Sequence, residues 1–341
     1  MKLQDFDFDL PQELIAQQPA LQRDHSNLLI PNEGSNKIVK FYDLINYLRA
    51  GDLMIFNNSR VINAKLLLQK DNNKIININL NKPINDFVWL GFARPSKNLI
   101  EGEIFQFGKH RVIIRKKLEF GEVEIEFVLD NMKVFDFLDL YGMIPLPQYI
   151  KRTEKNDEDK HRYQNIYSQI RGSVANSTAG LHFTEELMEK IKALNVEIDF
   201  VTLHVGAGTF LPVKTENILE HKMHSEWCEV SRDTADKINK AKREKRRVIV
   251  VGTTSMRTIE SCSVDGVVIP QSKETNIFIK PGYKFQIADL MLTNFHLPKS
   301  TLFMLVCAFA GMDKIKALYN YAIESKMRFF SYGDAMLIKK E

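Results

Sequence analysis

The sequence predicts an α/β protein, namely a mixed-sheet layered α/β domain with an inserted small antiparallel β-barrel domain. Two changes of texture support this architecture. Before about residue 64 and after about residue 144, short apolar runs lie between helix-like segments, as in layered α/β folds. Between these limits, short strands follow one another with turns between them, which is typical of a small barrel. We therefore predict a discontinuous α/β domain of residues 1–63 plus 145–341, and a barrel of residues 64–144.

The composition is that of a folded protein and limits its partners only weakly. Of 341 residues, 44% are hydrophobic and 26% are charged, and the net charge of +4 permits a nucleic-acid partner without requiring one. The three cysteines form no CxxC pair, which fits a reducing cytoplasm. The sequence shows no signal-peptide core, and its longest apolar run is shorter than the roughly 20 residues of a membrane span. We expect a cytoplasmic monomer with no membrane partner.

The first 62 residues open the α/β domain. Two short helices and one buried strand are predicted here, at residues 10–16, 41–48 and 53–56. The strand runs into Asn-Asn-Ser-Arg at residues 57–60. Such a cluster is typical of a turn, but the adjacent arginine favours a ligand contact. Asn57 and Arg60 are therefore candidate substrate contacts.

The barrel is predicted from strand-like segments at residues 74–81, 86–93, 103–108, 111–117 and 121–129. At residues 123–127, apolar and acidic residues alternate with the period of two that a half-buried strand shows. The basic run at 109–117 suits either a solvated strand face, which we favour, or an RNA contact. Prolines and a charged stretch at 145–162 form the linker back to the α/β domain.

The middle of the sequence is the part richest in histidine, glycine and hydroxyl residues. Thr184 is suited to cap a helix, and Asn195 to end it in the left-handed conformation. Residues 196–203 then read as a strand, and His-Val-Gly-Ala-Gly-Thr follows at 204–209. In open α/β sheets, ligands bind beyond the carboxyl ends of the strands. The two glycines of this loop either turn the chain or allow a ligand to approach its backbone closely.

Beyond this loop the sequence predicts a basic helix at residues 237–247, strands at 248–251 and 277–279, and a buried helix at 301–310, capped by Ser300 and stopped by Gly311. Polar clusters follow two apolar runs, at 252–255 and 293–296. The first cluster opens a helix, where exposed backbone N–H groups suit an anion or a polar ligand. We expect these clusters and those at 57–60 and 204–209 to converge on one crevice.

Several chemistries lack their motifs. There is no dinucleotide-binding glycine fingerprint, no P-loop, no HExxH and no serine nucleophile elbow. His221, His224 and Cys228 have a spacing that suits a metal, but no further ligand cluster completes a tetrahedral set, so we predict no metal. Four histidines lie in the loops described above, and each either transfers a proton, contacts a ligand or braces its loop: His182, His204, His224 and His296.

A series of long motifs runs in order from end to end of the chain. They are Phe-Asn-Asn-Ser-Arg-Val-Ile at 56–62, Thr-Ala-Gly-Leu-His-Phe at 178–183, Val-Thr-Leu-His-Val-Gly-Ala-Gly-Thr-Phe at 201–210, His-Lys-Met-His-Ser-Glu at 221–226, Val-Gly-Thr-Thr-Ser at 251–255, Leu-Thr-Asn-Phe-His-Leu-Pro at 292–298 and Arg-Phe-Phe-Ser-Tyr-Gly-Asp-Ala at 328–335. This series resembles the signature of the S-adenosylmethionine:tRNA ribosyltransferase-isomerase family. One departure is that Asn176-Ser177 stands where that family usually has Ala-Pro, which removes a constraint on the backbone.

The resemblance implies a tRNA-modifying transferase of queuosine biosynthesis. Such an enzyme moves and isomerises the ribosyl moiety of S-adenosylmethionine onto 7-aminomethyl-7-deazaguanine (preQ1) in tRNA, giving epoxyqueuosine and releasing adenine and methionine. S-adenosylmethionine is then a co-substrate, no prosthetic group is needed, and tRNA carrying preQ1 in its anticodon is the partner. The alternative is a non-catalytic RNA-binding protein of the same fold.

On this basis we assign expected roles to residues of the motifs. The candidate catalytic residues are His204, His224, Glu226 and His182. The candidate substrate-binding residues are Asn57, Arg60, Thr178, Gly206, Gly208, Thr209, Thr253, Thr254, Thr293, Asn294, His296, Arg328, Tyr332 and Asp334. The candidate tRNA-binding residues are Arg243, Arg246 and Arg247 on the predicted basic helix.

Overall fold

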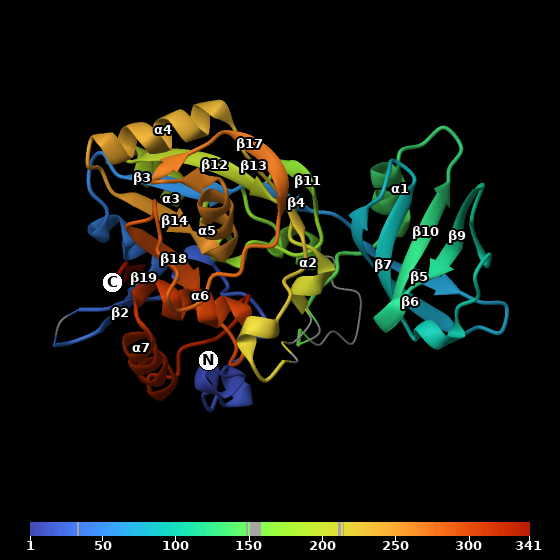
Figure 1. Cartoon of the computed structure of the whole chain (residues 1–341), viewed down its shortest axis with the longest axis horizontal. Coiled ribbons are helices and arrows are strands. Elements are labelled where there is room, and N and C mark those ends of the chain that lie inside the picture. The colour runs from blue at the N-terminus through green and yellow to red at the C-terminus, as the bar shows by residue number, and fades with distance from the viewer. Residues whose placement is uncertain (33, 148, 151–157, 211–212, 214) are drawn as a thin grey trace.

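A nine-stranded mixed sheet forms the centre of the larger of two lobes in this computed structural model (Figure 1). The structure describes all residues except 33, 148, 151–157, 211–212 and 214, and the side chains of 209 and 210 also lie outside the description. The strand order is β17-β13-β12-β3-β14-β18-β19-β1-β2. The strands are β1 Asn27–Ile30, β2 Lys37–Lys40, β3 Leu53–Asn57, β12 Glu197–Leu203, β13 Glu226–Val230, β14 Val248–Val251, β17 Gln271–Thr275, β18 Leu290–Asn294 and β19 Ala335–Lys339.

Four neighbouring strands of this sheet, β12, β3, β14 and β18, run parallel to one another. Their carboxyl ends therefore lie along one edge of the sheet. The strands at both sides of this group, β13 and β19, are antiparallel to their neighbours β12 and β18. The predicted mixed-sheet α/β fold is thus confirmed, and the predicted strands at 53–56, 196–203 and 248–251 lie at the centre of the sheet.

Helices cover both faces of the sheet. They are α3 Glu185–Ala193, α4 Arg232–Arg243, α5 Gly252–Ser261, α6 Thr301–Ala310 and α7 Met312–Glu324, and the short helix α2 Glu158–Arg162 lies outside these layers. Leu53 and Ile55 of β3 pack in the core formed with α4, α5, α6 and α7, whereas Met54 and Phe56 pack with α3 and the 3₁₀ segment Phe41–Tyr47. This division follows from the alternation of side chains along a strand. The result is a three-layer α/β lobe.

Local signals in the sequence fix several helix ends. Thr184 accepts a hydrogen bond from the Leu187 N–H and caps α3, and Asn195 follows that helix with φ +57°. The Ser300 hydroxyl accepts from the Phe303 N–H and caps α6, which ends at Gly311. Both helices were predicted with these residues. In the described part of the chain, no helix is long and apolar enough to cross a bilayer.

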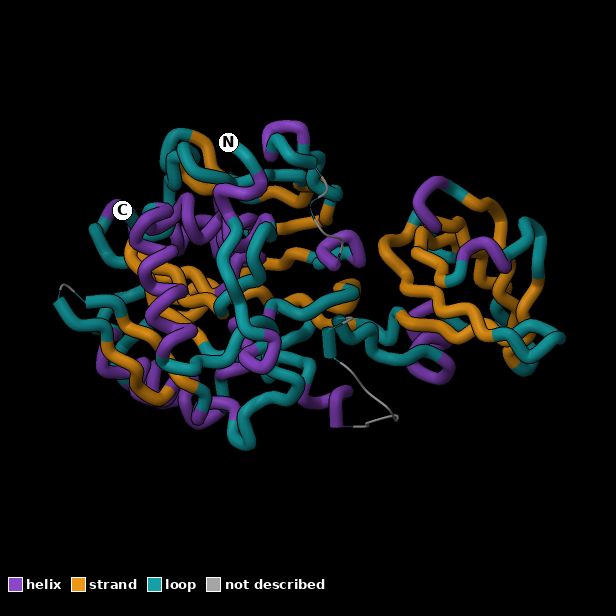
Figure 2. Tube along the Cα trace, turned by 90° about the horizontal axis from the view of Figure 1, so that it is seen from below, coloured by secondary structure: helices purple, strands orange, loops and turns teal. Residues whose placement is uncertain are grey.

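The smaller lobe is built on a six-stranded antiparallel sheet of order β5-β6-β7-β10-β9-β8 (Figure 2). Its elements are β5 Lys65–Gln69, β6 Ile75–Pro83, β7 Val88–Arg94, β8 Ile104–Phe107, β9 His110–Lys117, β10 Glu122–Val128 and the helix α1 Val134–Tyr141. The inward residues of the strands form one apolar core with α1. Within the described residues no ladder joins β5 to β8, so the sheet is barrel-like rather than closed by hydrogen bonds.

Two features join the lobes. Strands β4 Ser59–Val61 and β11 Ile170–Ser173 pair in parallel where the chain leaves the larger lobe and where it returns. At an irregularity in β6, the Asn81 side chain reaches the larger lobe and accepts a hydrogen bond from the Ala207 N–H at 2.9 Å. Ala207 also packs in the apolar core of the smaller lobe.

Some predicted elements are wrong. Residues 277–279 form no strand, and the ladder in this part of the chain belongs to β17, at 271–275. The basic helix spans 232–243 instead of 237–247, because Lys245 has φ +57° and the chain turns into β14. The helix predicted at 10–16 is only the 3₁₀ turn Gln12–Leu14. Helix α1 lies within a stretch for which we predicted only strands.

The new boundary separates the three arginines that the sequence grouped together. Arg243 is exposed at the end of α4. The Arg246 guanidinium donates to the carboxylates of Glu197 and Glu244. Arg247 makes an ion pair with Asp52, which is only 2% exposed. Two of the three guanidinium groups are therefore engaged in holding the start of β3 and β12.

We expect Arg247→Met to lower the free energy of unfolding by about 2–3 kcal/mol, because it leaves the buried Asp52 carboxylate without its cation. Arg243→Met is the matched control and should change it by less than about 0.5 kcal/mol. Urea unfolding of both variants measures the difference. Equal effects of the two substitutions would contradict this account of Arg247.

Candidate active site

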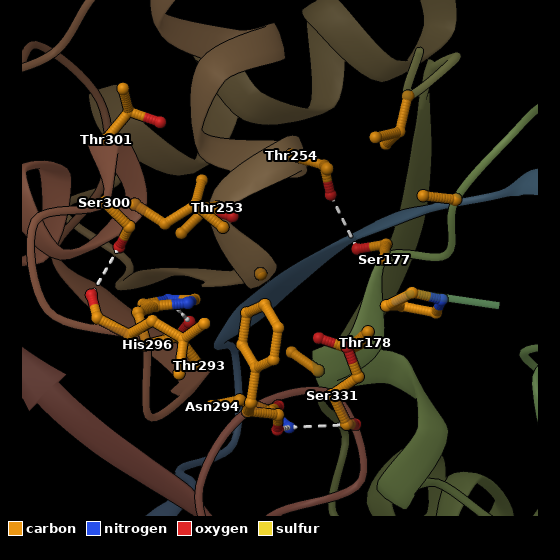
Figure 3. Close-up of a pocket in the computed structure, with 18 of the residues that line it drawn as sticks. Ser177, Thr178, Thr253, Thr254, Thr293, Asn294, His296, Ser300, Thr301 and Ser331 are labelled. Carbon is orange, nitrogen blue, oxygen red and sulfur yellow. Dashed lines mark hydrogen bonds between the residues drawn. The ribbon is translucent and has the colours of Figure 1, made fainter. Parts of the chain in front are cut away.

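A cavity of about 520 Å³ lies at the carboxyl edge of the parallel strands (Figure 3). Its walls come from the segment 175–179, the start of α5, the end of β18, the segment 296–302 and the turn at 330–331. Pro147, Tyr149, Tyr163, Val205 and Val213 complete the described lining. Two of the four predicted polar clusters, 252–255 and 293–296, are thus brought together, as the parallel order of β14 and β18 requires.

The segment 175–179 is tied down by side-chain hydrogen bonds. Asn165 donates to the Ser177 carbonyl at 3.1 Å, and Asn176 donates to the Tyr163 carbonyl at 3.1 Å. The hydroxyls of Ser177 and Thr254 lie 2.6 Å apart, which joins this segment to the start of α5. These contacts fix the backbone at the place where the family's usual proline is missing. Thr178, Thr253 and Thr254, which we predicted as substrate contacts, all line the cavity.

His182 lies behind the cavity and orients Asn294. The Asn294 amide nitrogen donates to the carbonyls of Phe330 and Ser331, at 2.9 and 3.3 Å, so its oxygen faces His182 as an acceptor. The His182 Nε2 must then carry a proton, and its Nδ1 accepts from the Ser26 hydroxyl at 2.7 Å. Burial lowers the pKa of His182 to about 4, so the ring is neutral at pH 7. Its position is that of a bracing residue.

His296 is the imidazole that lines the cavity. Its Nε2 lies 3.0 Å from the Thr293 hydroxyl, and its backbone N–H donates to the Tyr319 hydroxyl at 2.9 Å. In the described part of the chain its Nδ1 has no hydrogen-bond partner. Burial lowers the pKa of His296 to about 3, which keeps the ring neutral. A neutral imidazole in the wall of a cavity is able to accept a proton from a bound molecule.

Three residues predicted to contact the substrate instead hold a turn. The Asp334 carboxylate is fully buried and accepts from the backbone N–H groups of Asn27 and Arg328, and the Arg328 guanidinium also donates to it. The Tyr332 hydroxyl points to Asp159 and lies outside the lining of the cavity. Between them, Phe330 is held at φ +73°, a conformation that non-glycine residues rarely adopt. This turn presents Phe330 and Ser331 to the cavity.

The backbone N–H groups of the glycine loop form hydrogen bonds within the protein. The N–H groups of residues 204, 205, 206 and 207 donate, in order, to the Trp227 carbonyl, the Ser173 hydroxyl, Glu226 and Asn81, at 2.9 to 3.1 Å. A Cβ on Gly206 would lie 2.8 Å from the Asn81 oxygen, and one on Gly208 would lie 2.5 Å from the His224 ring. Both glycines therefore allow close packing within the protein. The Thr209 side chain lies outside the described residues.

Two candidate catalytic residues, His204 and His224, lie beside this loop and outside the described lining of the cavity. The His204 Nδ1 is 2.7 Å from the Ser59 hydroxyl, and its ring stacks on Trp227 with centroids 5.0 Å apart. Burial lowers the pKa of His204 to about 4. His224 is exposed, and in the described structure it makes no hydrogen bond to Glu226. Glu226 pairs instead with Arg257.

The cluster at 57–60 does not reach the cavity either. Asn57 is buried and bonds to both the N–H and the carbonyl of Leu203, which ties β3 to β12. Arg60 is exposed and lines a separate cleft with Asp139 and Arg171, near the smaller lobe. Asn57 and Arg60 thus lie outside the described lining of the cavity, and the expected convergence is incomplete.

Arg257 is a charged residue of the cavity lining that our sequence analysis did not assign to the site. It lies on α5, its side chain is 7% exposed, and it forms an ion pair with Glu226. Its Nε and Nη2 atoms are buried and find no hydrogen-bond partner in the part of the chain that the structure describes. Its sequence signal was its place five residues after the start of a helix that follows a buried strand. Within the described residues, no group of three His, Cys, Asp or Glu side chains could hold a metal.

The three lowered histidine pKa values predict a specific loss of stability in acid. The ordinary pKa of 6.5 applies to the unfolded chain, and His182, His204 and His296 have folded values of about 4, 4 and 3. The unfolded chain thus binds protons first, and the free energy of unfolding falls as the pH drops from 6.5 towards 4. Each histidine contributes up to about 1.4 kcal/mol per pH unit. Urea unfolding of His182→Gln between pH 7 and 5 should show a shallower dependence than the parent, and an equal slope would contradict the assignment.

The comparisons with known proteins agree over the whole chain. Residues 3–338 match the family described as Queuosine biosynthesis protein. A protein of Rickettsia bellii (strain RML369-C) named S-adenosylmethionine:tRNA ribosyltransferase-isomerase is 57% identical over 356 residues, with 100% of both chains covered. One of the same name from Rickettsia felis is 54% identical over 371 residues, again with 100% of both chains covered.

A solved structure leads to the same family. The S-adenosylmethionine tRNA ribosyltransferase of Thermotoga maritima is 31% identical, with a TM-score of 0.54, and the match covers 98% of this chain and 99% of that one. The resemblance found in the motifs is confirmed by these findings. The chain belongs to the queuosine biosynthesis protein family.

Proposed function

We propose that this protein is an S-adenosylmethionine:tRNA ribosyltransferase-isomerase. It transfers and isomerises the ribosyl moiety of S-adenosylmethionine onto preQ1 in tRNA, giving epoxyqueuosine and releasing adenine and methionine. The observation that carries the proposal is the end-to-end likeness, at 57% identity, to a relative of that name. The cavity adds to it, because a non-catalytic RNA-binding protein has no need of an enclosed site for a small molecule.

We further propose that S-adenosylmethionine binds in the cavity at the carboxyl edge of β14 and β18. The volume of about 520 Å³ lies in the range of small-molecule sites. The position, beyond the ends of parallel strands, is where open α/β sheets bind ligands. Hydroxyl and amide groups of Thr178, Thr253, Thr254, Thr293 and Asn294 line it, which suits a ribose and an adenine. The co-substrate needs no prosthetic group beside it.

The reaction asks the site for two proton transfers. A base takes a proton from the ribose carbon next to the sulfonium, and an acid helps adenine to leave. His296 is the imidazole in the cavity wall, and its neutral state fits the first task. His204 and His224 remain candidates from the neighbouring glycine loop. His182, through Asn294, and Glu226, through Arg257, support the site from behind.

The tRNA contact that we propose involves a basic side chain of the larger lobe. We expect a monomer that works in the cytoplasm, with the barrel lobe of residues 64–144 acting as a separate domain. Of the three candidate arginines, Arg243 has an exposed side chain that is free to contact a phosphate, while Arg246 and Arg247 are held by carboxylates. A phosphate contact of this kind weakens as salt is added.

The function is tested directly by incubating the protein with S-adenosylmethionine and tRNA that carries preQ1. We expect free adenine to appear in step with an epoxyqueuosine nucleoside, identified by its mass after digestion of the tRNA. Folded protein that binds this tRNA but leaves the nucleoside unchanged would favour the non-catalytic alternative.

The histidine roles are separated by three variants, His296→Asn, His204→Gln and His224→Gln. Loss of a residue that transfers a proton should slow single-turnover adenine release about 10²–10⁴-fold while co-substrate affinity and melting temperature hold. Loss of a bracing residue should instead lower affinity and melting temperature together. We expect the first pattern for His296. The assignment fails if His296→Asn releases adenine within a few-fold of the parent rate.

A further inference from the structure

Arg257 carries an unused pair of hydrogen-bond donors. Its Nη1 is engaged by Glu226, while Nε and Nη2 are buried and have no hydrogen-bond partner among the described residues. These two N–H groups point the same way from the planar guanidinium and form the fork that matches a carboxylate or a phosphate. Buried charged donors are almost always paired in folded proteins, so an open fork calls for an explanation.

The described cavity lining beside this fork contains a helix start and no carboxylate. Arg257 lines the cavity together with Gly252, Thr253 and Thr254, the first residues of α5, and the N-cap residue Val251 offers no side chain to their N–H groups. A helix start of this kind favours an anion. The described lining holds one other cation, Lys299, and no carboxylate. Lys299 is already paired with Asp7 at 2.7 Å.

The same cavity presents an unused acceptor. Within the described ranges, the Oδ1 atom of Asn176 is buried without a hydrogen-bond partner, while its amide nitrogen donates to the Tyr163 carbonyl. An open donor fork and an open acceptor in one cavity are the complement of a zwitterion that carries a carboxylate and an ammonium group. A phosphate of the tRNA backbone satisfies only the donors. It is also joined to a sugar on both sides, which hinders its entry to a side chain that is 7% exposed.

We propose that Arg257 binds the carboxylate of the methionine moiety of S-adenosylmethionine through Nε and Nη2. The inference rests on the proposed function, and it identifies the end of the co-substrate that binds at this wall of the cavity. Glu226 fixes the guanidinium by Nη1 and so aims the free fork. Because the carboxylate is remote from the reacting ribose, Arg257 acts in binding and orientation, and it leaves proton transfer to other groups.

The test compares two ligands without tRNA, by calorimetry: S-adenosylmethionine and its decarboxylated analogue, which lacks only the carboxylate. The parent should bind S-adenosylmethionine about 10- to 100-fold more tightly, as a charge-assisted bidentate pair predicts. The double variant Arg257→Gln/Glu226→Gln removes the fork without leaving a buried unpaired carboxylate. It should bind both ligands with the affinity that the parent has for the analogue.

Two controls sharpen the comparison. Glu226→Gln alone keeps Arg257 and should keep most of the preference for the carboxylate. Lys299→Gln removes the other cation of the lining and should keep the full preference. The proposal is overturned if the parent does not distinguish the ligands, if the double variant weakens both equally, or if the preference disappears with Lys299 instead. Melting temperatures show whether each variant folds.

The reaction of the parent with preQ1-containing tRNA separates this inference from the proposed function. A parent that prefers the carboxylate but forms no epoxyqueuosine would refute the reaction and support the carboxylate site. A parent that forms epoxyqueuosine without preferring the carboxylate would do the reverse. If the double variant keeps the preference but loses tRNA affinity, the fork binds a phosphate and the proposal is wrong.

Discussion

The site depends on one buried carboxylate, that of Glu226. Its side chain is 6% exposed, and such a charge is tolerated only when it is paired and hydrogen-bonded. Glu226 begins β13, accepts from the Gly206 N–H and pairs with Arg257 on α5. One ionised group therefore connects strand β13, the glycine loop and a wall of the cavity. Removing one partner of such a pair typically costs about 3–5 kcal/mol of stability, and the loss affects the packing of all three elements.

The buried motif histidines share one kind of contact. His182, His204 and His296 each have a hydroxyl within 3.0 Å of a ring nitrogen, from Ser26, Ser59 and Thr293. A neutral imidazole is thereby held in one orientation. The His182 Nε2 donates to the Asn294 side-chain oxygen, and the Asn294 amide donates to the Phe330 carbonyl in the turn. Of these three histidines, only His296 belongs to the described lining of the cavity.

Local sequence signals predicted the elements well where the signal was itself local. The caps at Thr184 and Ser300, the left-handed Asn195 and the strand at 248–251 depend on neighbours in the chain. The strand expected at 277–279 failed because an apolar triplet does not specify its partner, and β13 pairs with 271–275 instead.

The composition of the cavity was predictable only in part. Clusters at strand ends pointed to the correct edge of the sheet, yet strand order decides which clusters face each other, and that order is a long-range property. The bond from Ala207 to Asn81 spans 126 positions of the chain, and the pairing of Arg257 with Glu226 spans 31. Neither contact leaves a trace in spacing or periodicity. What the sequence offered at Arg257 was a charged residue in a buried helix, a pattern whose partner only the fold reveals.

The parallel pairing of β4 with β11 has a consequence for how the molecule varies. It clasps the chain at residues 59–61 and 170–173, so everything between these points forms one large closed loop whose ends are fixed by the larger lobe. The entropy of closing a loop grows only slowly with its length, by about 0.6 kcal/mol for each doubling. Turns at the far end of the smaller lobe can thus lengthen or shorten at little energetic cost and without shifting the register of the nine-stranded sheet. The β4–β11 pairing therefore allows turns of the smaller lobe to change in length while the hydrogen bond between Asn81 and the glycine loop is kept.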